Sequence, residues 1–188
     1  MKNLTTFKIG STILDKNSKP YIIAEIGVNH NNNIKISKKI IDFCVRENVD
    51  AVKFQTFNAE TLALKNTPKV KYQLKSKNDK ESHFMMLKKL ELSKKDHKYL
   101  LNYCRKKGID FISTPYDVES AKFLNALNVD AIKVASADLT DYFLHEYLSK
   151  TNKKIIISTG MSNMSEIQDT LKIYKKKIHN VSLLHCVS

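Results

Sequence analysis

The chain has 188 residues, of which 42% are hydrophobic and 27% are charged, and its formal net charge is +13. This length suffices for one domain with a sizeable core, and the composition is typical of soluble globular proteins. No apolar run approaches the roughly 20 residues that span a bilayer, and the first residues lack the apolar centre of a signal peptide. These observations predict a cytoplasmic protein and exclude a membrane partner.

Lysine carries almost all of the basic charge. Arg46 and Arg105 are the only arginines among 32 basic residues. Arginine is the usual residue for bidentate contacts with phosphates and bases, and the chain has no nucleic-acid-binding motif. We interpret the lysines as solvated helix faces, which argues against a nucleic-acid partner but would help to attract small anionic substrates.

The cysteines do not indicate a metal site or a disulfide. Cys44, Cys104 and Cys186 are an odd number and lack the spacing of a metal-binding motif. We interpret them as reduced thiols, which agrees with a cytoplasmic location.

The first part of the chain predicts a hairpin, a strand and a helix. A short hairpin is expected from residues 7–13 and a turn at 15–18. Residues 21–27 are the first convincing buried strand, and a polar loop follows at 29–33. Apolar residues with a helical period then predict a helix over 34–49.

The second strand, over residues 51–57, carries a lysine and a glutamine two positions apart. Because side chains alternate faces along a strand, Lys53 and Gln55 point to the same side. Buried parallel strands are normally continuous apolar runs, and an ammonium inside one is costly unless it meets an anion or its pKa is lowered. Either Lys53 has partners in a site, or this is an edge strand whose lysine reaches water.

Residues 58–92 interrupt the alternation with a long segment that contains a polar run at 75–80 and a short predicted helix near 83–90. Loops of this length inside a compact domain are commonly lids or binding loops. A capping-box-like pattern beginning at Ser93 then opens a helix that ends at Gly108.

Strands and helices alternate regularly in the rest of the chain. Strands are predicted over 110–115, 131–136, 154–160 and 181–186, and helices over 118–127, 141–149 and 165–175. With the two earlier strands, this gives six β–α repeats and hence a parallel sheet with right-handed crossovers.

Two α/β architectures fit this alternation, the doubly wound sheet and the (β/α)₈ TIM barrel. Barrels build their active sites at the C-terminal ends of many strands. In this chain polar or small residues end every strand: Glu25, Gln55, Thr114, Ser136, Ser158 and Ser188. A doubly wound fold would instead need a glycine-rich loop at one crevice, and this chain, with four glycines, has none. The sequence therefore favours the barrel.

Six strands do not close an eight-stranded barrel, and a bare sheet edge is rarely tolerated. We therefore expect an incomplete (β/α)₈ barrel over residues 21–188, preceded by a hairpin extension over residues 1–20. The chain is then the N-terminal part of a longer protein, or a fragment that another chain completes.

The strand ends supply groups that suit an anion. Lys53 and Lys133 lie in otherwise apolar strands, and hydroxyls recur at the same strand ends as Thr114, Ser136 and Ser158. Each hydroxyl alone is more simply explained as a turn or cap residue. Paired cations together with hydrogen-bond donors would cradle a phosphate, so their recurrence favours a phosphate site.

Five segments, in chain order, are similar to motifs of the sialic acid synthase family. They are 24–30 (AEIGVNH), 52–56 (VKFQT), 111–115 (FISTP), 132–136 (IKVAS) and 157–161 (ISTGM). Residues 184–186 (LHC) also fit. The chain thus resembles N-acetylneuraminate, legionaminate and pseudaminate synthases over nearly its whole length from Phe7 onward.

The resemblance implies an enzyme of sialic acid biosynthesis. This family condenses phosphoenolpyruvate with an N-acetylated, N-acetylmannosamine-like amino sugar and forms a nine-carbon 2-keto acid and phosphate. Its catalytic domain is a (β/α)₈ barrel, followed by an antifreeze-like domain that is absent from this chain and is contributed across a homodimer. A divalent cation, typically Mn²⁺, activates the sugar carbonyl.

The resemblance also implies site residues. The phosphoenolpyruvate-binding set corresponds to Lys53, Thr114, Lys133, Ser136 and Ser158. Glu25 corresponds to the glutamate that handles protons or orients water, Gln55 to a substrate contact, and Ser188 to a polar residue that reaches the substrates. The expected catalytic residues are Glu25, Lys53, Gln55 and Asp138.

Two departures from the family pattern affect the site. Asp138 stands where many members carry a glutamate, so its carboxylate has a shorter reach. The family's metal-binding histidines belong to segments beyond Ser188, so no metal ligand is expected within this chain. His185 and His30 are alternative ligands, although a histidine in an apolar strand is more often a hydrogen-bonded core residue.

Two other functions stay open. Buried lysines suit Schiff-base chemistry, so an aldolase that uses Lys53 or Lys133 is one alternative. The other is an inactive or binding remnant of the synthase, because the expected metal ligands, last strands and downstream domain lie outside residues 1–188. We expect no turnover from this stretch alone. The identity of the sugar and the oligomeric state do not follow from the sequence.

Overall fold

The computed structural model describes residues 6–70, 73 and 81–187. Its strands are β1 (Phe7–Ile9), β2 (Thr12–Leu14), β3 (Ile23–Gly27), β4 (Ala51–Thr56), β5 (Asp110–Pro115), β6 (Ala131–Val134), β7 (Ile155–Ser158) and β8 (Val181–Leu184). Its α-helices are α1 (Ile34–Arg46), α2 (Ala59–Leu62), α3 (His83–Leu90), α4 (Lys94–Lys107), α5 (Val118–Leu127), α6 (Tyr142–Lys150) and α7 (Met164–Ile173). None of the described helices is long and apolar enough to cross a membrane.

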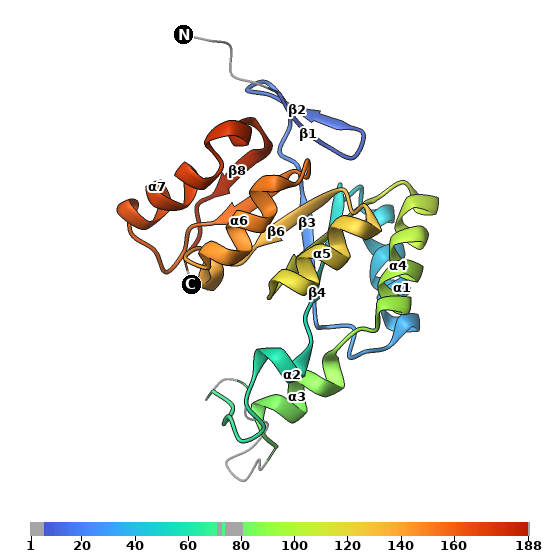
Figure 1. The fold of residues 1–188 in the computed structure, drawn as a ribbon. Coiled ribbons are helices and arrows are strands. Elements are labelled where there is room, and N and C mark those ends of the chain that lie inside the picture. Colours follow the sequence, from blue (N-terminus) through green and yellow to red (C-terminus); the bar gives the residue numbers. More distant parts are fainter. Residues whose placement is uncertain (1–5, 71–72, 74–80, 188) are drawn as a thin grey trace.

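Six of the strands form one parallel sheet in the order β3-β4-β5-β6-β7-β8, which is their order in the chain. A doubly wound sheet reverses its strand order at one point and carries helices on both faces. Here the order never reverses, and crossovers of one hand place the helices α1, α4, α5, α6 and α7 along one side (Figure 1). This arrangement matches part of the wall of a TIM barrel.

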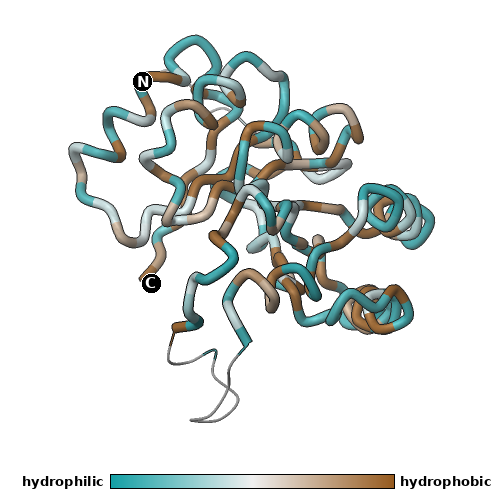
Figure 2. The backbone as a smooth tube through the Cα atoms, turned by 60° about the horizontal axis from the view of Figure 1, so that its bottom comes forward, coloured by the Kyte–Doolittle hydropathy of each residue, from teal (hydrophilic) through white to brown (hydrophobic). Residues whose placement is uncertain are grey.

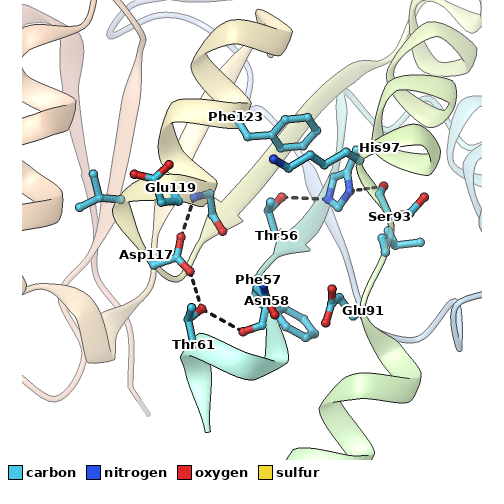
Figure 3. A pocket seen from close by; sticks show the side chains of 14 residues that line it. Thr56, Phe57, Asn58, Thr61, Glu91, Ser93, His97, Asp117, Glu119 and Phe123 are labelled. Carbon is cyan, nitrogen blue, oxygen red and sulfur yellow. Dashed lines mark hydrogen bonds between the residues drawn. The ribbon is translucent and has the colours of Figure 1, made fainter.

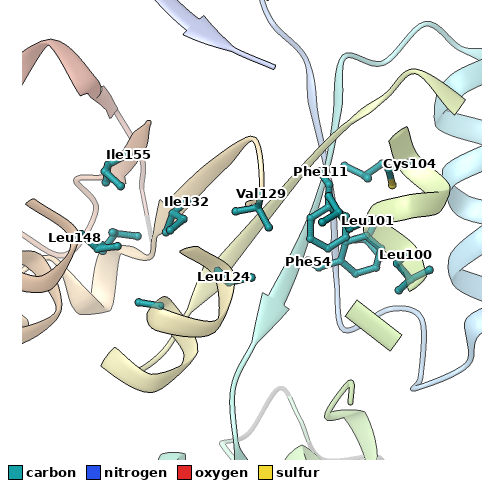
Figure 4. Close-up of a cluster of buried hydrophobic side chains, with 14 of the residues drawn as sticks. Phe54, Leu100, Leu101, Cys104, Phe111, Leu124, Val129, Ile132, Leu148 and Ile155 are labelled. Carbon is teal, nitrogen blue, oxygen red and sulfur yellow. The ribbon is translucent and has the colours of Figure 1, made fainter. Parts of the chain in front are cut away.

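The main core lies between the sheet and the helices. Alternate strand side chains point outward into this layer, including Phe54, Phe111 and Ile132, and meet Leu100 and Leu124 from the helices (Figure 4). The rings of Phe54 and Phe111 stack with centroids 5.1 Å apart. The apolar segments accordingly run through the middle of the molecule, while the helices mix apolar and polar residues (Figure 2). Burial of each such side chain stabilises the fold by about 1.5–3 kcal/mol.

The inner face of the sheet begins with an apolar layer. Ala51, Ile112, Ala131 and Ile156 stand at the N-terminal ends of four strands, and Ile9 from the hairpin packs against them. The hairpin β1–β2 thereby closes the lower end of the inner face. Apolar side chains are confined to this end, so the polar side chains of the same strands gather at the other.

The hairpin reverses at a different place from the one expected. Strands β1 and β2 pair within residues 7–14, so the hairpin reverses at Gly10 and Ser11. The predicted turn at 15–18 also forms, with Ser18 N donating to the Asp15 carbonyl at 3.3 Å, but it follows β2. Gly10 adopts a φ of +51°, which an L-residue with a side chain takes only with strain. Its backbone also lies against Asp110, so that a Cβ built on Gly10 would stand 2.0 Å from Oδ1 of that carboxylate.

The long segment after β4 forms a small layer of its own. Helix α2 was not expected, whereas α3 matches the predicted helix. Phe57, Ala59, Phe84 and Leu87 form a separate apolar cluster that also contacts Tyr116. This cluster ties the segment to the C-terminal ends of the strands. The predicted polar run 75–80 lies outside the described residues.

Several elements are shorter than expected, each for a local reason. Helix α1 ends at Arg46 because Asn48 takes a left-handed φ of +55°. Strand β6 ends at Val134, since Ser136–Asp138 turn into a short 3₁₀ helix. A second 3₁₀ segment, Lys175–Asn180, follows α7.

Replacement of Gly10 by alanine should destabilise the protein. The strained left-handed backbone costs about 1–2 kcal/mol, and the displacement of Asp110 costs more. We therefore expect the free energy of unfolding, measured by urea titration, to fall by roughly 2–3 kcal/mol. Gly108→Ala is the matched control, because Gly108 also has a positive φ, +73°, but no atom within 4 Å of a built Cβ. Equal losses in the two variants would contradict the close approach to Asp110.

Candidate functional site

Polar side chains line the inner face of the sheet at the C-terminal ends of its strands. Register places Glu25 of β3 beside Lys53 of β4, and Gln55 of β4 beside Thr114 of β5. Each of these residues shares the strand face that carries Ala51 and Ile112 lower down, since side chains alternate with a period of two. The alternation that turns Ala51 and Ile112 to the inner face therefore also turns these polar side chains toward one cleft.

Lys53 is held by two partners within this cleft. Its Nζ lies 2.8 Å from Glu25 Oε2 and donates a hydrogen bond of 2.9 Å to Thr114 Oγ1. The lysine side chain is 11% exposed, whereas that of Glu25, on the outermost strand, is 55% exposed. Lys53 is therefore a buried, paired cation, and the alternative of an edge-strand lysine that reaches water is wrong.

Lys133 stands on β6 with the same inward direction and is also buried. Its Nζ donates to the carbonyl oxygen of Val134 at 2.7 Å and to Ser158 Oγ. Burial, followed by the nearby charge of Lys53, lowers the pKa of Lys133 to about 8. Lys53 and Lys133 both line one cleft, so the two ammonium groups face the same space.

The cleft between these strands has a volume of about 390 Å³. It brings together seven of the residues predicted from the sequence: Glu25, Lys53, Gln55, Thr114, Lys133, Ser136 and Ser158. Ser188 lies outside the described residues. Two ammonium groups, one carboxylate and several hydroxyls form a net basic, hydrogen-bonding cleft, which suits a small anion with more than one acidic group.

Asp138 stands beside the cleft and does not line it. The 3₁₀ helix after β6 turns its side chain inward, and its Oδ2 is buried without a hydrogen-bond partner among the described residues. Burial, then the charge of Asp141, raises the pKa of Asp138 to about 6, while Lys133 acts in the opposite direction. Asp138 can therefore hold or release a proton near neutral pH.

Sequence reasoning missed two neighbours of the cleft. Tyr116 lines it, with its ring edge-on to Phe57 at 6.1 Å. Cys186 approaches from beyond β8, and its thiol donates to Ser158 Oγ at 3.1 Å. Tyr116 directly follows the last residue of β5, and this position was the signal that could have placed it at the cleft. The sequence indicated only a reduced thiol for Cys186. Its position two residues after Leu184, which lines the cleft, was the signal that both side chains point the same way.

The two histidines that were weighed as metal ligands lie elsewhere. His30 is buried and tilts against Phe54 with ring centroids 6.0 Å apart, and its Nδ1 accepts from Asn32 N. This puts it in the helix-facing layer, away from the cleft. His185 is exposed just after β8, and is therefore not the core histidine that the apolar strand suggested. The described residues contain no group of three His, Cys, Asp or Glu side chains that could hold a metal ion, so they do not by themselves form a metal site.

A second cavity, of about 490 Å³, lies between the N-terminal ends of α4 and α5 (Figure 3). His97 forms its inner wall, with Nε2 accepting from Thr56 Oγ1 at 2.9 Å and Nδ1 donating to the Ser93 carbonyl at 3.0 Å. The Ser113 hydroxyl in turn lies 2.7 Å from Thr56 Oγ1. Burial lowers the pKa of His97, so the ring is neutral and its polar atoms are paired within the fold. This cavity lacks the paired cations of the cleft.

Three comparisons place the chain among known proteins. A family model described as the NeuB family matches residues 40–188. The N,N'-diacetyllegionaminic acid synthase of Campylobacter jejuni is 42% identical over 173 residues, which are 90% of this chain and 52% of that protein. The protein of the same name from Legionella pneumophila is 38% identical, over 89% of this chain and 49% of its own length.

The fold comparison agrees with these relatives. The N-acetylneuraminic acid synthetase of Leptospira borgpetersenii superposes with a TM-score of 0.83 at 29% identity, over 100% of this chain and 61% of that one. The chain spans about half the length of the curated relatives it matches. Because the family model covers most of its residues, the chain belongs to the NeuB family.

Proposed function

We propose that this chain forms part of the catalytic domain of an enzyme that condenses phosphoenolpyruvate with an N-acetylated, N-acetylmannosamine-like amino sugar. The products would be a nine-carbon 2-keto acid of the sialic acid type and phosphate. The observation that carries this proposal is the convergence of Lys53 and Lys133, both buried, on one cleft. The names of the relatives, which are synthases of legionaminic and N-acetylneuraminic acids, support the same reaction.

Phosphoenolpyruvate fits the charge of the cleft. It carries a phosphate and a carboxylate, and the cleft offers two ammonium groups with the hydroxyls of Thr114, Ser136 and Ser158 around them. Charge-assisted hydrogen bonds of this kind are about twice as strong as neutral ones. We assign Lys53 and Lys133 to the phosphate and carboxylate of this substrate.

The reaction needs a proton donor and an oriented water molecule. Carbon 3 of phosphoenolpyruvate would bond to the sugar aldehyde carbon, water would add to carbon 2, and phosphate would leave as carbon 2 becomes a ketone. Glu25, which pairs with Lys53, stands where it can orient the water. Asp138, whose pKa is raised to about 6, does not line the cleft, so it would exchange a proton with this water through one intervening water molecule. Gln55 would contact either substrate.

A divalent cation, Mn²⁺ in the family pattern, would polarise the sugar carbonyl when bound. We propose that its ligands belong to segments that follow Ser188 in the family pattern; the described residues contain no group of three His, Cys, Asp or Glu side chains that could hold it. The residues of the cleft keep the roles given above, which are to bind the anionic substrate and to move protons.

The sheet supports a larger barrel. Both β3 and β8 have a neighbour on one side alone, and Leu183 and Leu184 of β8 are exposed. We propose that two further strands close an eight-stranded barrel between β3 and β8, since a bare sheet edge is a liability. An antifreeze-like domain, a homodimer and a cytoplasmic location complete the proposal, with residues 1–20 as its hairpin extension.

A Schiff-base aldolase is the second candidate. The pKa of Lys133, lowered to about 8, leaves part of its amine neutral and nucleophilic at neutral pH. Borohydride reduction in the presence of pyruvate would then trap an irreversible adduct on Lys133. An unmodified lysine under these conditions, together with phosphate release from phosphoenolpyruvate, supports the synthase.

The full-length gene product should release phosphate only when phosphoenolpyruvate, an N-acetylated amino sugar and Mn²⁺ are all present. Lys53→Met and Lys133→Met should each lower kcat/KM for phosphoenolpyruvate at least about 30-fold, since truncation of one member of a buried charged pair costs roughly 2–5 kcal/mol. Lys98→Met, at an exposed position, is the matched control. Absence of phosphate release with every sugar of the family would contradict the proposed reaction.

The affinity for phosphoenolpyruvate should fall at alkaline pH. The Lys133 ammonium is charged below its pKa of about 8, so its attraction is complete below that pH and is lost as the pH rises through it. We expect KM for phosphoenolpyruvate to rise by up to about tenfold per pH unit above pH 8. Lys133→Arg stays charged and should flatten this rise, whereas Lys98→Arg should not. An identical alkaline rise in Lys133→Arg would show that another group titrates.

Phosphoenolpyruvate should protect one cysteine from alkylation. Cys44 and Cys104 are buried, and burial raises their pKa, that of Cys104 to about 12, whereas Cys186 is partly exposed beside Ser158. Iodoacetamide should therefore label Cys186 first, and phosphoenolpyruvate should slow this labelling. Peptide mass spectrometry measures both rates without any need for turnover. Labelling that is unchanged by phosphoenolpyruvate would contradict its binding beside Ser158.

A further inference from the structure

Two residues assigned to the reaction stand on one short turn. After β6 the chain forms the 3₁₀ helix Ser136–Asp138, in which Asp138 N donates to the Ala135 carbonyl at 3.1 Å and Leu139 N to the Ser136 carbonyl at 3.3 Å. Ser136 lines the cleft, whereas Asp138, which has one buried carboxylate oxygen, does not. The position of this turn therefore determines how both side chains meet a substrate.

Helix α7 holds the turn from behind. Thr170 is 1% exposed, and its hydroxyl donates to the carbonyl of Leu139, 31 residues earlier, at 2.8 Å. Leu139 is itself buried in the main core. Leu139, the residue that directly follows the turn, is thus held both by a hydrogen bond and by apolar packing.

Helix α6 supplies a second support. His145 is fully buried, and its Nδ1 lies 2.8 Å from the hydroxyl of Tyr174, whose ring stands edge-on at 5.6 Å. Burial lowers the pKa of His145. Its backbone is linked to the turn, because His145 N donates to the Asp141 carbonyl at 3.1 Å and Asp141 N donates to the Asp138 carbonyl at 3.0 Å. Neither His145 nor Tyr174 lines the cleft.

The unpaired buried polar atoms of the described residues gather at this place. They are Asp138 Oδ2 and His145 Nε2. A buried polar atom without a partner costs roughly 1–3 kcal/mol, and such atoms persist chiefly where a function or a stored strain needs them. The hydrogen bonds of Thr170 and Tyr174 thus lie beside a turn whose Asp138 carboxyl has an oxygen without a partner among the described residues.

We propose that Thr170, His145 and Tyr174 are positioning residues that hold the Ser136–Asp138 turn in its place at the cleft. This inference rests on the proposed function, because it assigns these side chains to the alignment of groups in that reaction. They act through the turn and touch no substrate themselves.

Isosteric variants test this proposal in the full-length gene product. Thr170→Val and Tyr174→Phe each delete one hydroxyl, and the loss of one hydrogen bond should lower kcat/KM for phosphoenolpyruvate about three- to tenfold, since the turn carries both Ser136 and Asp138. Thr151→Val and Tyr103→Phe are the controls, because each deletes a comparable bond, to Leu148 O or to Asp42, away from the turn. His145→Gln, which keeps a donor and an acceptor, should retain more activity than His145→Leu.

A second readout does not need turnover. Titration of the Asp138 carboxyl, followed by NMR of ¹³C-labelled aspartate, should give a pKa near 6 in the parent protein and a lower one in Thr170→Val and Tyr174→Phe, as the turn loosens into solvent. Kinetics and an Asp138 pKa equal to those of the controls would overturn the inference. A shifted Asp138 pKa in a protein that releases no phosphate would support the positioning of the turn and refute the proposed reaction alone.

Discussion

The structure depends on the burial of two like charges on the inner face of one sheet. Lys53 and Lys133 are held among apolar strands, where an unpaired ammonium is costly. Glu25 offsets one charge, and hydroxyl and carbonyl oxygens accept from both amines, but a positive charge remains in the cleft. Burial, and after it the charge of Lys53, lowers the pKa of Lys133, and a bound dianion would offset both effects. The arrangement that makes this cleft costly to fold thus also favours an anionic substrate.

The fold tolerates this arrangement because polar and apolar layers are separated along each strand. Ala51, Ile112, Ala131 and Ile156 fill the lower half of the inner face, and the hairpin closes it with Ile9. The outer face is packed against the helices around Phe54 and Phe111. Strands anchored at one end and on one face hold the side chains at their other end in place, which a catalytic site requires.

Much of the cleft could be predicted from the sequence, because the alternation of side chains between the two faces of a strand depends only on neighbouring residues. The two-residue spacing of Lys53 and Gln55, and the repeated hydroxyls after apolar runs, were enough to place them on one face. The turn at Gly10 was missed because it depends on contact with Asp110, which is distant in the chain. The orientation of His30 and the burial of Asp138 also depend on how loops pack against distant residues, so the sequence did not predict them. The positioning bonds of Thr170 and Tyr174 cross between helices, and no spacing in the sequence reveals them.

The central claim is that Lys53 and Lys133 together bind one phosphoenolpyruvate molecule. A crystal structure of the full-length gene product with phosphoenolpyruvate tests it most directly. The account predicts that oxygens of this one molecule lie within about 2.7–3.2 Å of both Nζ atoms, beside Thr114 and Ser158. Phosphoenolpyruvate bound away from either lysine, for example in the cavity beside His97, would contradict it.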